Sequence, residues 1–89
     1  MSRKDRIAAR LTEGLHPTRL EIEDESDRHA GHAGWRAEGE THYRVYIVSA
    51  AFSGKSAVAR HRLVYDQLGE EFAGGLHALA VRARTPDEA

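Results

Sequence analysis

Six histidines are the side chains best suited to chemistry in this chain, and no cysteine accompanies them. A neutral imidazole nitrogen binds zinc, copper and iron, and a thiolate is the other common protein ligand for these metals. Because the chain offers no thiolate, it would hold such a metal through imidazole or through sulfur from a partner. The candidate ligands are His16, His29, His32, His42, His61 and His77.

Three of these histidines have ordinary structural explanations. His61 falls on the apolar stripe of a predicted helix, so we interpret it as a half-buried ring that bonds a backbone carbonyl. His16 precedes Pro17 at the end of another predicted helix and is interpreted as a turn residue near the negative helix terminus. His42 falls on the polar face of a predicted strand and is interpreted as a surface residue.

The other three histidines lie where a side chain can point away from the domain. His77 follows Gly74-Gly75 at the first turn of a predicted strand, where the rim of the sheet meets the preceding helix. His29 and His32 lie in a glycine-bearing connection of about 16 residues, which is long for a compact domain. This His-x-x-His pair lacks two of the four ligands of a closed zinc site, so it is a weak zinc signal. Spacing does not determine whether His29 meets His77, because 48 positions separate them.

Apolar periodicity predicts the elements that must hold these side chains. A four-residue recurrence of apolar side chains after a capping serine indicates an amphipathic helix, which Gly14 and Pro17 end. Alternation of apolar and polar residues indicates strands with one face buried. The predicted elements are a helix that begins after Ser2, strands at 19–24 and 41–49, a helix of about 16 residues after Ser56, and a strand from Leu76 to Ala83.

The order of these elements predicts an α+β fold. The first two strands should pair antiparallel, whereas a strand, a helix and a strand joined by a long connection imply a right-handed crossover between parallel neighbours. The predicted arrangement is α-β-β-α-β, a three-stranded mixed sheet with both helices packed on one face. Residues 1–84 should form a single domain, and residues 85–89 a short disordered tail.

Composition narrows the classes of function. The 89 residues carry a net charge of −1 with acidic and basic residues interspersed, so the chain lacks the strong positive field of a protein whose main task is to grip phosphate backbones. A charged start and the lack of a long apolar run predict a cytoplasmic protein that does not enter membranes. No nucleophile elbow, Walker loop or metalloprotease motif is present, so we predict a non-enzyme. The carboxylates between Glu21 and Asp27 are interpreted as solvated edge residues.

A series of short motifs, taken in order, resembles the BolA family. The similarity covers roughly residues 15 to 86. It implies a class II KH-like fold, which agrees with the arrangement predicted above. The motifs are Leu20-Glu21-Ile22, Glu25-Ser26, His29-Ala30-Gly31-His32, Glu40-Thr41-His42-Tyr43, Val48-Ser49, Phe52-Ser53-Gly54-Lys55-Ser56, Arg60-His61-Arg62-Leu63-Val64-Tyr65, Leu76-His77-Ala78-Leu79 and Thr85-Pro86.

The resemblance implies an adaptor that pairs with a monothiol glutaredoxin around a bridging [2Fe-2S] cluster, in cluster trafficking or iron sensing. In that family one ligand is the histidine of the His-Ala-Leu motif, which His77 matches, and another is a loop residue, which His29 matches with His32 as the alternative. The glutaredoxin cysteine and glutathione would supply the remaining sulfur, so the isolated chain is expected to hold no cofactor. Alone it is expected to be a monomer or a weak homodimer.

A DNA-binding transcriptional regulator is the alternative function. Lys55, Arg60 and Arg62 form a small basic group at the start of the second predicted helix, where backbone amides would add to an anion site. Against this alternative, the turn Gly54-Lys55-Ser56-Ala57 lacks the second glycine of the GXXG loop with which KH modules clamp nucleic acid. The same residues have a simpler interpretation as a solvated helix face.

Overall fold

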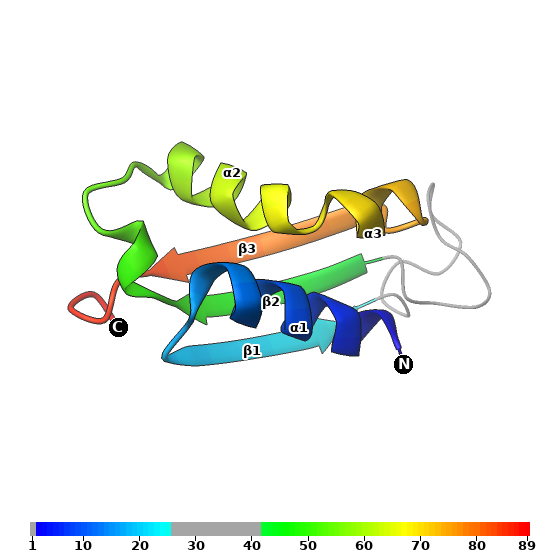
Figure 1. Ribbon diagram of the computed structural model, residues 1–89, viewed down its shortest axis with the longest axis horizontal. Coiled ribbons are helices and arrows are strands. Elements are labelled where there is room, and N and C mark those ends of the chain that lie inside the picture. The colour runs from blue at the N-terminus through cyan, green and yellow to red at the C-terminus, as the bar shows by residue number, and fades with distance from the viewer. Residues whose placement is uncertain (1, 26–41) are drawn as a thin grey trace.

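The structure is a computed structural model that describes residues 2–25 and 42–89 (Figure 1). Its elements follow the predicted order, with a short 3-10 helix added after the second strand. They are α1 (Arg3–Leu15), β1 (Arg19–Asp24), β2 (His42–Val48), the 3-10 helix η2 (Ala50–Phe52), α2 (Ala57–Gln67), α3 (Gly69–Ala73) and β3 (Ala78–Arg84).

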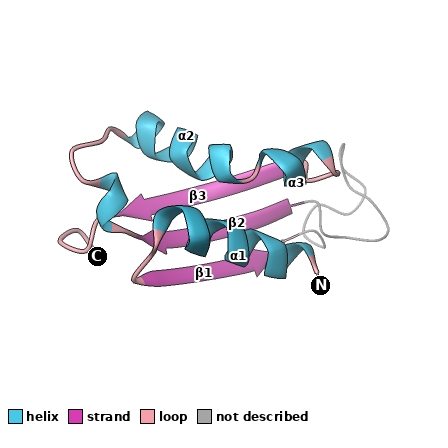
Figure 2. Ribbon diagram, viewed as in Figure 1, coloured by secondary structure: helices cyan, strands magenta, loops and turns pink. Residues whose placement is uncertain are grey.

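The three strands form one mixed sheet in the order β1-β2-β3. β1 pairs antiparallel with β2 and β2 pairs parallel with β3, so that Arg44 stands opposite Glu23 on one side and Ala80 on the other. The helices cover one face of the sheet (Figure 2). The predicted α+β class, strand pairing and helix placement are therefore confirmed.

The core lies between the helices and one face of the sheet. Tyr43, Val45 and Ile47 alternate inward along β2 and are at most 2% exposed, as the sequence pattern predicts. They pack in one cluster with side chains from the helices that cover this face. These side chains include Ile7, Leu11, Leu15, Phe52, Val64 and Leu68. Alternation turns the remaining strand side chains away from the helices. We call this second surface the open face; it carries Arg19, Glu21, Arg44, Tyr46 and Arg82.

Helix α1 begins as predicted and ends differently. The Ser2 hydroxyl accepts from the Asp5 amide while the Asp5 carboxylate accepts from the Ser2 amide, which completes a capping box. The helix ends at His16, which adopts a left-handed conformation with φ 45°. Gly14 lies inside the helix instead, where a Cβ would stand 2.0 Å from Gln67 Oε1 of α2. A larger residue there would displace the flexible Gln67 side chain, and Gly14 does not stop the helix.

The second predicted helix is divided into α2 and α3 at Leu68. Ser56 caps α2 as expected, because its hydroxyl accepts from the Ala59 amide. The buried face is rotated from the predicted stripe: His61 is exposed and stacks on Tyr65 with ring centroids 6.4 Å apart. The interpretation of His61 as a half-buried ring is therefore wrong. No helix within residues 2–25 and 42–89 is long and apolar enough to cross a bilayer.

Residues 85–89 fold back onto the domain. Thr85 is 7% exposed, and its amide donates to Glu88 Oε1 over 2.8 Å. The Glu88 carboxylate in turn accepts two hydrogen bonds from Arg60. These charge-assisted bonds hold the segment against α2, and the division of the chain at residue 84 stays a prediction.

Candidate functional site

The segment between α3 and β3 presents His77 at one end of the sheet. Gly75 adopts φ 119°, a backbone conformation that residues with a side chain rarely adopt. It lets the chain turn from α3 toward the strand. The Leu76 amide donates to the Glu71 carbonyl over 2.9 Å, and the Leu76 side chain is buried. His77 follows this anchored residue and is exposed, as predicted.

The buried carboxylate of Glu71 helps to hold the segment that precedes His77. Glu71 is 5% exposed and accepts hydrogen bonds from Arg3 Nε at 3.3 Å and from Arg6 Nε at 3.1 Å. Arg3 also donates from NH2 to the Gly74 carbonyl over 2.8 Å. One arginine therefore ties α1 to both α3 and the turn that precedes His77. This network is absent from the predicted sites, although arginines recur at three- and four-residue spacing on α1.

His42, at the start of β2, lies beside His77. The two ring centroids are 5.2 Å apart with the planes tilted by 52°, and β2 pairs His42 with Ala78. His42 is 6% exposed, so its interpretation as a surface residue is wrong. Strand alternation placed its side chain on the correct face, but the chain that enters β3 brings the His77 ring against it there. We call Glu25, His42 and His77 the ligand corner.

Glu25 joins this corner from the end of β1. Its amide donates to the His42 carbonyl over 2.8 Å, and its side chain is 9% exposed. Arg44 NH2 lies 3.5 Å from Glu25 Oε2. The interpretation of this carboxylate as a solvated edge residue is therefore wrong, because it is buried beside a cation. Arg44 connects the corner to the rest of the open face.

The predicted loop ligands His29 and His32 lie outside the described residues. Within residues 2–25 and 42–89 no group of three or more histidines, cysteines or carboxylates is arranged to hold a metal ion. Two adjacent imidazoles with no thiolate suit a metal centre whose other ligands come from elsewhere, and they do not suit a closed four-ligand site. Of the predicted cluster ligands the described residues contain His77 alone, and its pairing with a loop histidine stays a prediction.

The basic group at the start of α2 is occupied in part by the C-terminal turn. Arg60 donates to the Lys55 carbonyl over 2.9 Å and to the Ala83 carbonyl over 3.1 Å. Its two terminal nitrogens bind Glu88 at 2.6 and 3.1 Å. The hydrogen bond from Arg60 and a second from the Thr85 amide lower the pKa of Glu88 to about 2, and the hydrogen bond to Glu88 raises the pKa of Arg60. Arg60 is thus bound internally and turned away from bulk solvent.

A groove of about 290 Å³ lies between α2 and β3. Lys55 and Arg60 line it as the sequence suggested, whereas Arg62 does not. Arg82 and Arg84 of β3 line it as well. These two arginines are absent from the predicted basic group, although their two-residue spacing in a predicted strand places them on one face.

Comparison with known proteins finds the same family along the chain. A family model described as BolA-like protein matches residues 11–88. SufE-like protein 1, chloroplastic/mitochondrial, of Arabidopsis thaliana is 53% identical over 98% of this chain, which spans 24% of that protein. An uncharacterized protein in the cobS 5' region of Sinorhizobium is 51% identical over 99% of this chain, which spans 96% of that protein. BolA-like protein 1 of Mus musculus is 50% identical over 90% of this chain, which spans 56% of that protein.

Solved structures share the fold throughout. The BolA domain of SufE1 from Arabidopsis thaliana superposes with a TM-score of 0.90 at 52% identity and covers 100% of this chain, which covers 98% of that domain. BolA1 from the same plant gives a TM-score of 0.88 at 47% identity, with 100% of this chain and 97% of that chain covered.

Proposed function

The chain belongs to the BolA family, and from this premise we propose that it is an adaptor that binds a monothiol glutaredoxin and co-ligates a bridging [2Fe-2S] cluster. His77 would be its ligand from the ligand corner, and His29, with His32 as the alternative, its ligand from the loop. The adaptor would act in cluster trafficking or iron sensing, with the glutaredoxin cysteine and glutathione as the sulfur donors. We further propose that the chain is not an enzyme.

The exposed His77 ring on an anchored segment is the observation that carries this proposal. The Arg3, Glu71 and Leu76 contacts hold the backbone before it, so little freedom would be lost when the imidazole binds iron. His42 covers one side of that ring and limits its rotation. Replacement of thiolate by imidazole on one iron raises the reduction potential of such a cluster.

Binding of DNA is the second candidate, and the cationic groove between α2 and β3 is the observation that favours it. In this candidate Lys55, Arg60 and Arg62 would contact phosphate. Because Arg60 is engaged with Glu88, only Lys55 and Arg62 would be immediately available. We rank this function below the adaptor.

We propose the cytoplasm as the compartment and a monomer or weak homodimer as the state of the chain alone. Two Arabidopsis relatives are instead named as chloroplast proteins, and one of them also as a mitochondrial protein. A compartment is read from sequence signals, so a fluorescent fusion of the full-length protein tests this proposal. Exclusive signal from an organelle would contradict it.

The test of the adaptor is anaerobic mixing with a cluster-loaded monothiol glutaredoxin, followed by size-exclusion chromatography and visible circular dichroism. The parent chain should form a heterodimer with a changed visible spectrum. His77→Ala should abolish the changed spectrum, and of His29→Ala and His32→Ala only the variant that removes a ligand should do the same. His61→Ala is the matched control, because His61 is an exposed histidine on α2 outside the ligand corner.

Two outcomes would count against the adaptor. An unchanged spectrum with His77→Ala would remove that ligand from the proposal. A loss that is equal for His61→Ala and His77→Ala would show a general effect of histidine removal.

A further inference from the structure

Arg82 lies where two hollows of the surface meet. One is the groove of about 290 Å³ between α2 and β3, and the other is a shallow depression of about 680 Å³ on the open face. Arg82 and its neighbour Val81 line both. The two hollows therefore form one surface that crosses β3, which we call the β3 track.

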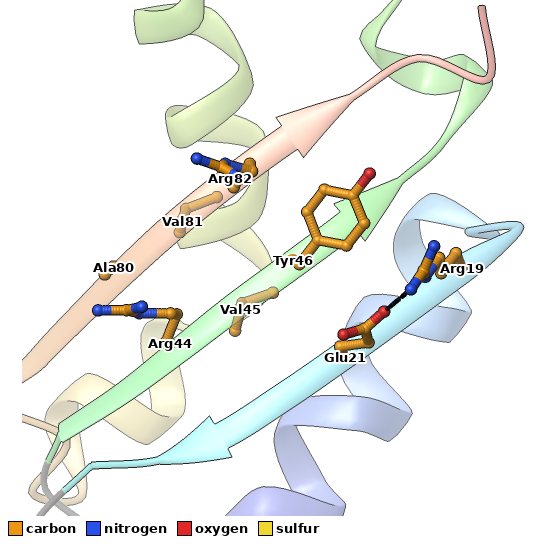
Figure 3. Close-up of a pocket in the computed structure, with 8 residues that line it drawn as sticks. All are labelled: Arg19, Glu21, Arg44, Val45, Tyr46, Ala80, Val81 and Arg82. Atoms are coloured by element: carbon orange, nitrogen blue, oxygen red, sulfur yellow. Dashed lines mark hydrogen bonds and ion pairs between the residues drawn. The ribbon is translucent and has the colours of Figure 1, made fainter. Parts of the chain in front are cut away.

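Positive charge follows this track. Arg82 is exposed and has no partner among the described residues 2–25 and 42–89. Arg84 lies two residues further along β3, at a spacing of about 6.6 Å on the same face. Arg44 has a side chain that is 60% exposed, and Figure 3 shows it reaching from β2 toward β3. Arginine presents several N–H donors in a plane and suits phosphate oxygens.

Tyr46 supplies a flat aromatic surface beside these charges. It stands opposite Arg82 in the sheet register and opposite Glu21 on its other side. The Arg19 guanidinium lies over the ring at 5.4 Å and is itself paired with Glu21, as Figure 3 shows. The ring is half-buried, so its position is fixed while part of it stays accessible for stacking.

Negative charge lies on the other side of the open face. Glu21 and Glu23 project from β1, and Glu21 is matched by Arg19. Arginines outnumber carboxylates on the part of the sheet formed by β2 and β3, where an anionic ligand would bind. A bound anionic chain would therefore run along β3, with Tyr46 of β2 beside it.

We propose that the β3 track binds single-stranded nucleic acid, with phosphates on Arg44, Arg82 and Arg84 and one base stacked on Tyr46. The combination of a positively charged path and an aromatic ring is the general means by which proteins hold single strands. This proposal goes beyond both candidate functions, because it assigns a different surface and a single-stranded ligand. It uses none of the proposed cluster ligands, so its failure would leave the adaptor proposal standing.

A single strand fits this surface better than a duplex or an acidic protein segment. In a duplex the bases are already stacked on each other, so Tyr46 has no free base to contact. An acidic peptide would satisfy the arginines and leave the stacking surface of Tyr46 unused.

The test is fluorescence anisotropy with a labelled oligothymidylate of about 12 nucleotides in about 50 mM salt. Arg82→Ala should weaken binding about fivefold and reduce the salt dependence, because three phosphate contacts give a slope of about −2 and two give about −1.4. Lys4→Ala is the matched control: it removes an exposed cation of α1 that lines neither hollow, and should change the affinity less than twofold.

A second pair of variants tests the stacking. Tyr46→Ala should weaken binding about tenfold, whereas Tyr46→Phe keeps the ring and should bind as the parent does. Far-UV circular dichroism establishes that each variant is folded.

Four results would overturn the proposal. They are no binding by the parent chain, equal losses with Lys4→Ala and Arg82→Ala, equal affinity for a duplex of the same length, and equally effective competition by polyglutamate. A loss with Lys55→Ala but not with Arg82→Ala would place binding at the start of α2 and would likewise overturn the β3 track.

Discussion

Neutralising the carboxylate of Glu71 should destabilise the fold and loosen the segment that presents His77. Glu71→Gln keeps the shape of the side chain and removes its charge. Arg3 and Arg6 would then lose their charged acceptor, and Arg3 is also the residue that holds the Gly74 carbonyl. The variant therefore tests whether this network supports the ligand corner.

The exposed fractions set the size of the effect. The Glu71 side chain is 6% exposed and that of Arg3 13%, whereas Arg6 is 38% exposed. Removal of one partner from a fully buried ion pair costs about 3–5 kcal/mol, and exposed pairs contribute about 0–1 kcal/mol. Because the arginines can partly rehydrate and glutamine retains one acceptor oxygen, we expect a loss of about 2 kcal/mol. In a domain of this size that lowers Tm by about 8–16 °C.

Thermal unfolding followed by far-UV circular dichroism measures this loss. Glu70→Gln is the control, since Glu70 is the neighbouring residue and its 77% exposed side chain pairs with Arg10 at 2.5 Å. Its effect should stay below about 0.5 kcal/mol and disappear in high salt. The ring-proton resonances of His77 should shift in Glu71→Gln and stay unchanged in Glu70→Gln. Equal losses of stability in the two variants, or an unchanged His77 resonance with Glu71→Gln, would refute the reasoning.

Two further predictions concern the fold around these surfaces. Glu88→Gln should lower the free energy of unfolding at neutral pH. The folded pKa of Glu88 is about 2 against an ordinary 4.5, so the stability that its carboxylate contributes is present above pH 4.5 and is lost as the pH falls toward 2. The stabilities of parent and variant, measured by urea denaturation, should therefore converge over that range. Ser49→Ala should cost about 2 kcal/mol in urea denaturation, since the buried hydroxyl donates to the Leu15 carbonyl over 2.6 Å and accepts from the Ala51 amide. The exposed Ser53→Ala should be neutral, and a neutral Ser49→Ala would contradict the role of that link.

Local patterns determined the architecture. Alternation along β1 and β2 assigned each side chain to a face, and serine caps located the starts of both main helices, because these features depend on residues at most four positions apart. The order of the elements then left few ways to form the sheet. The motif around His77 indicated the family that the comparisons established.

Contacts between distant segments decided the site, and no local pattern contains them. His42 and His77 are neighbours across 35 positions, and only the parallel pairing of β2 with β3 brings them together. Arg60 faces the sheet because its long stem lets the guanidinium reach the Ala83 carbonyl and Glu88, although its charge suggested a solvated face. The sequence therefore specified which elements form and which way their side chains point, whereas tertiary packing decided which polar groups meet, because a polar group settles wherever the fold places its partner.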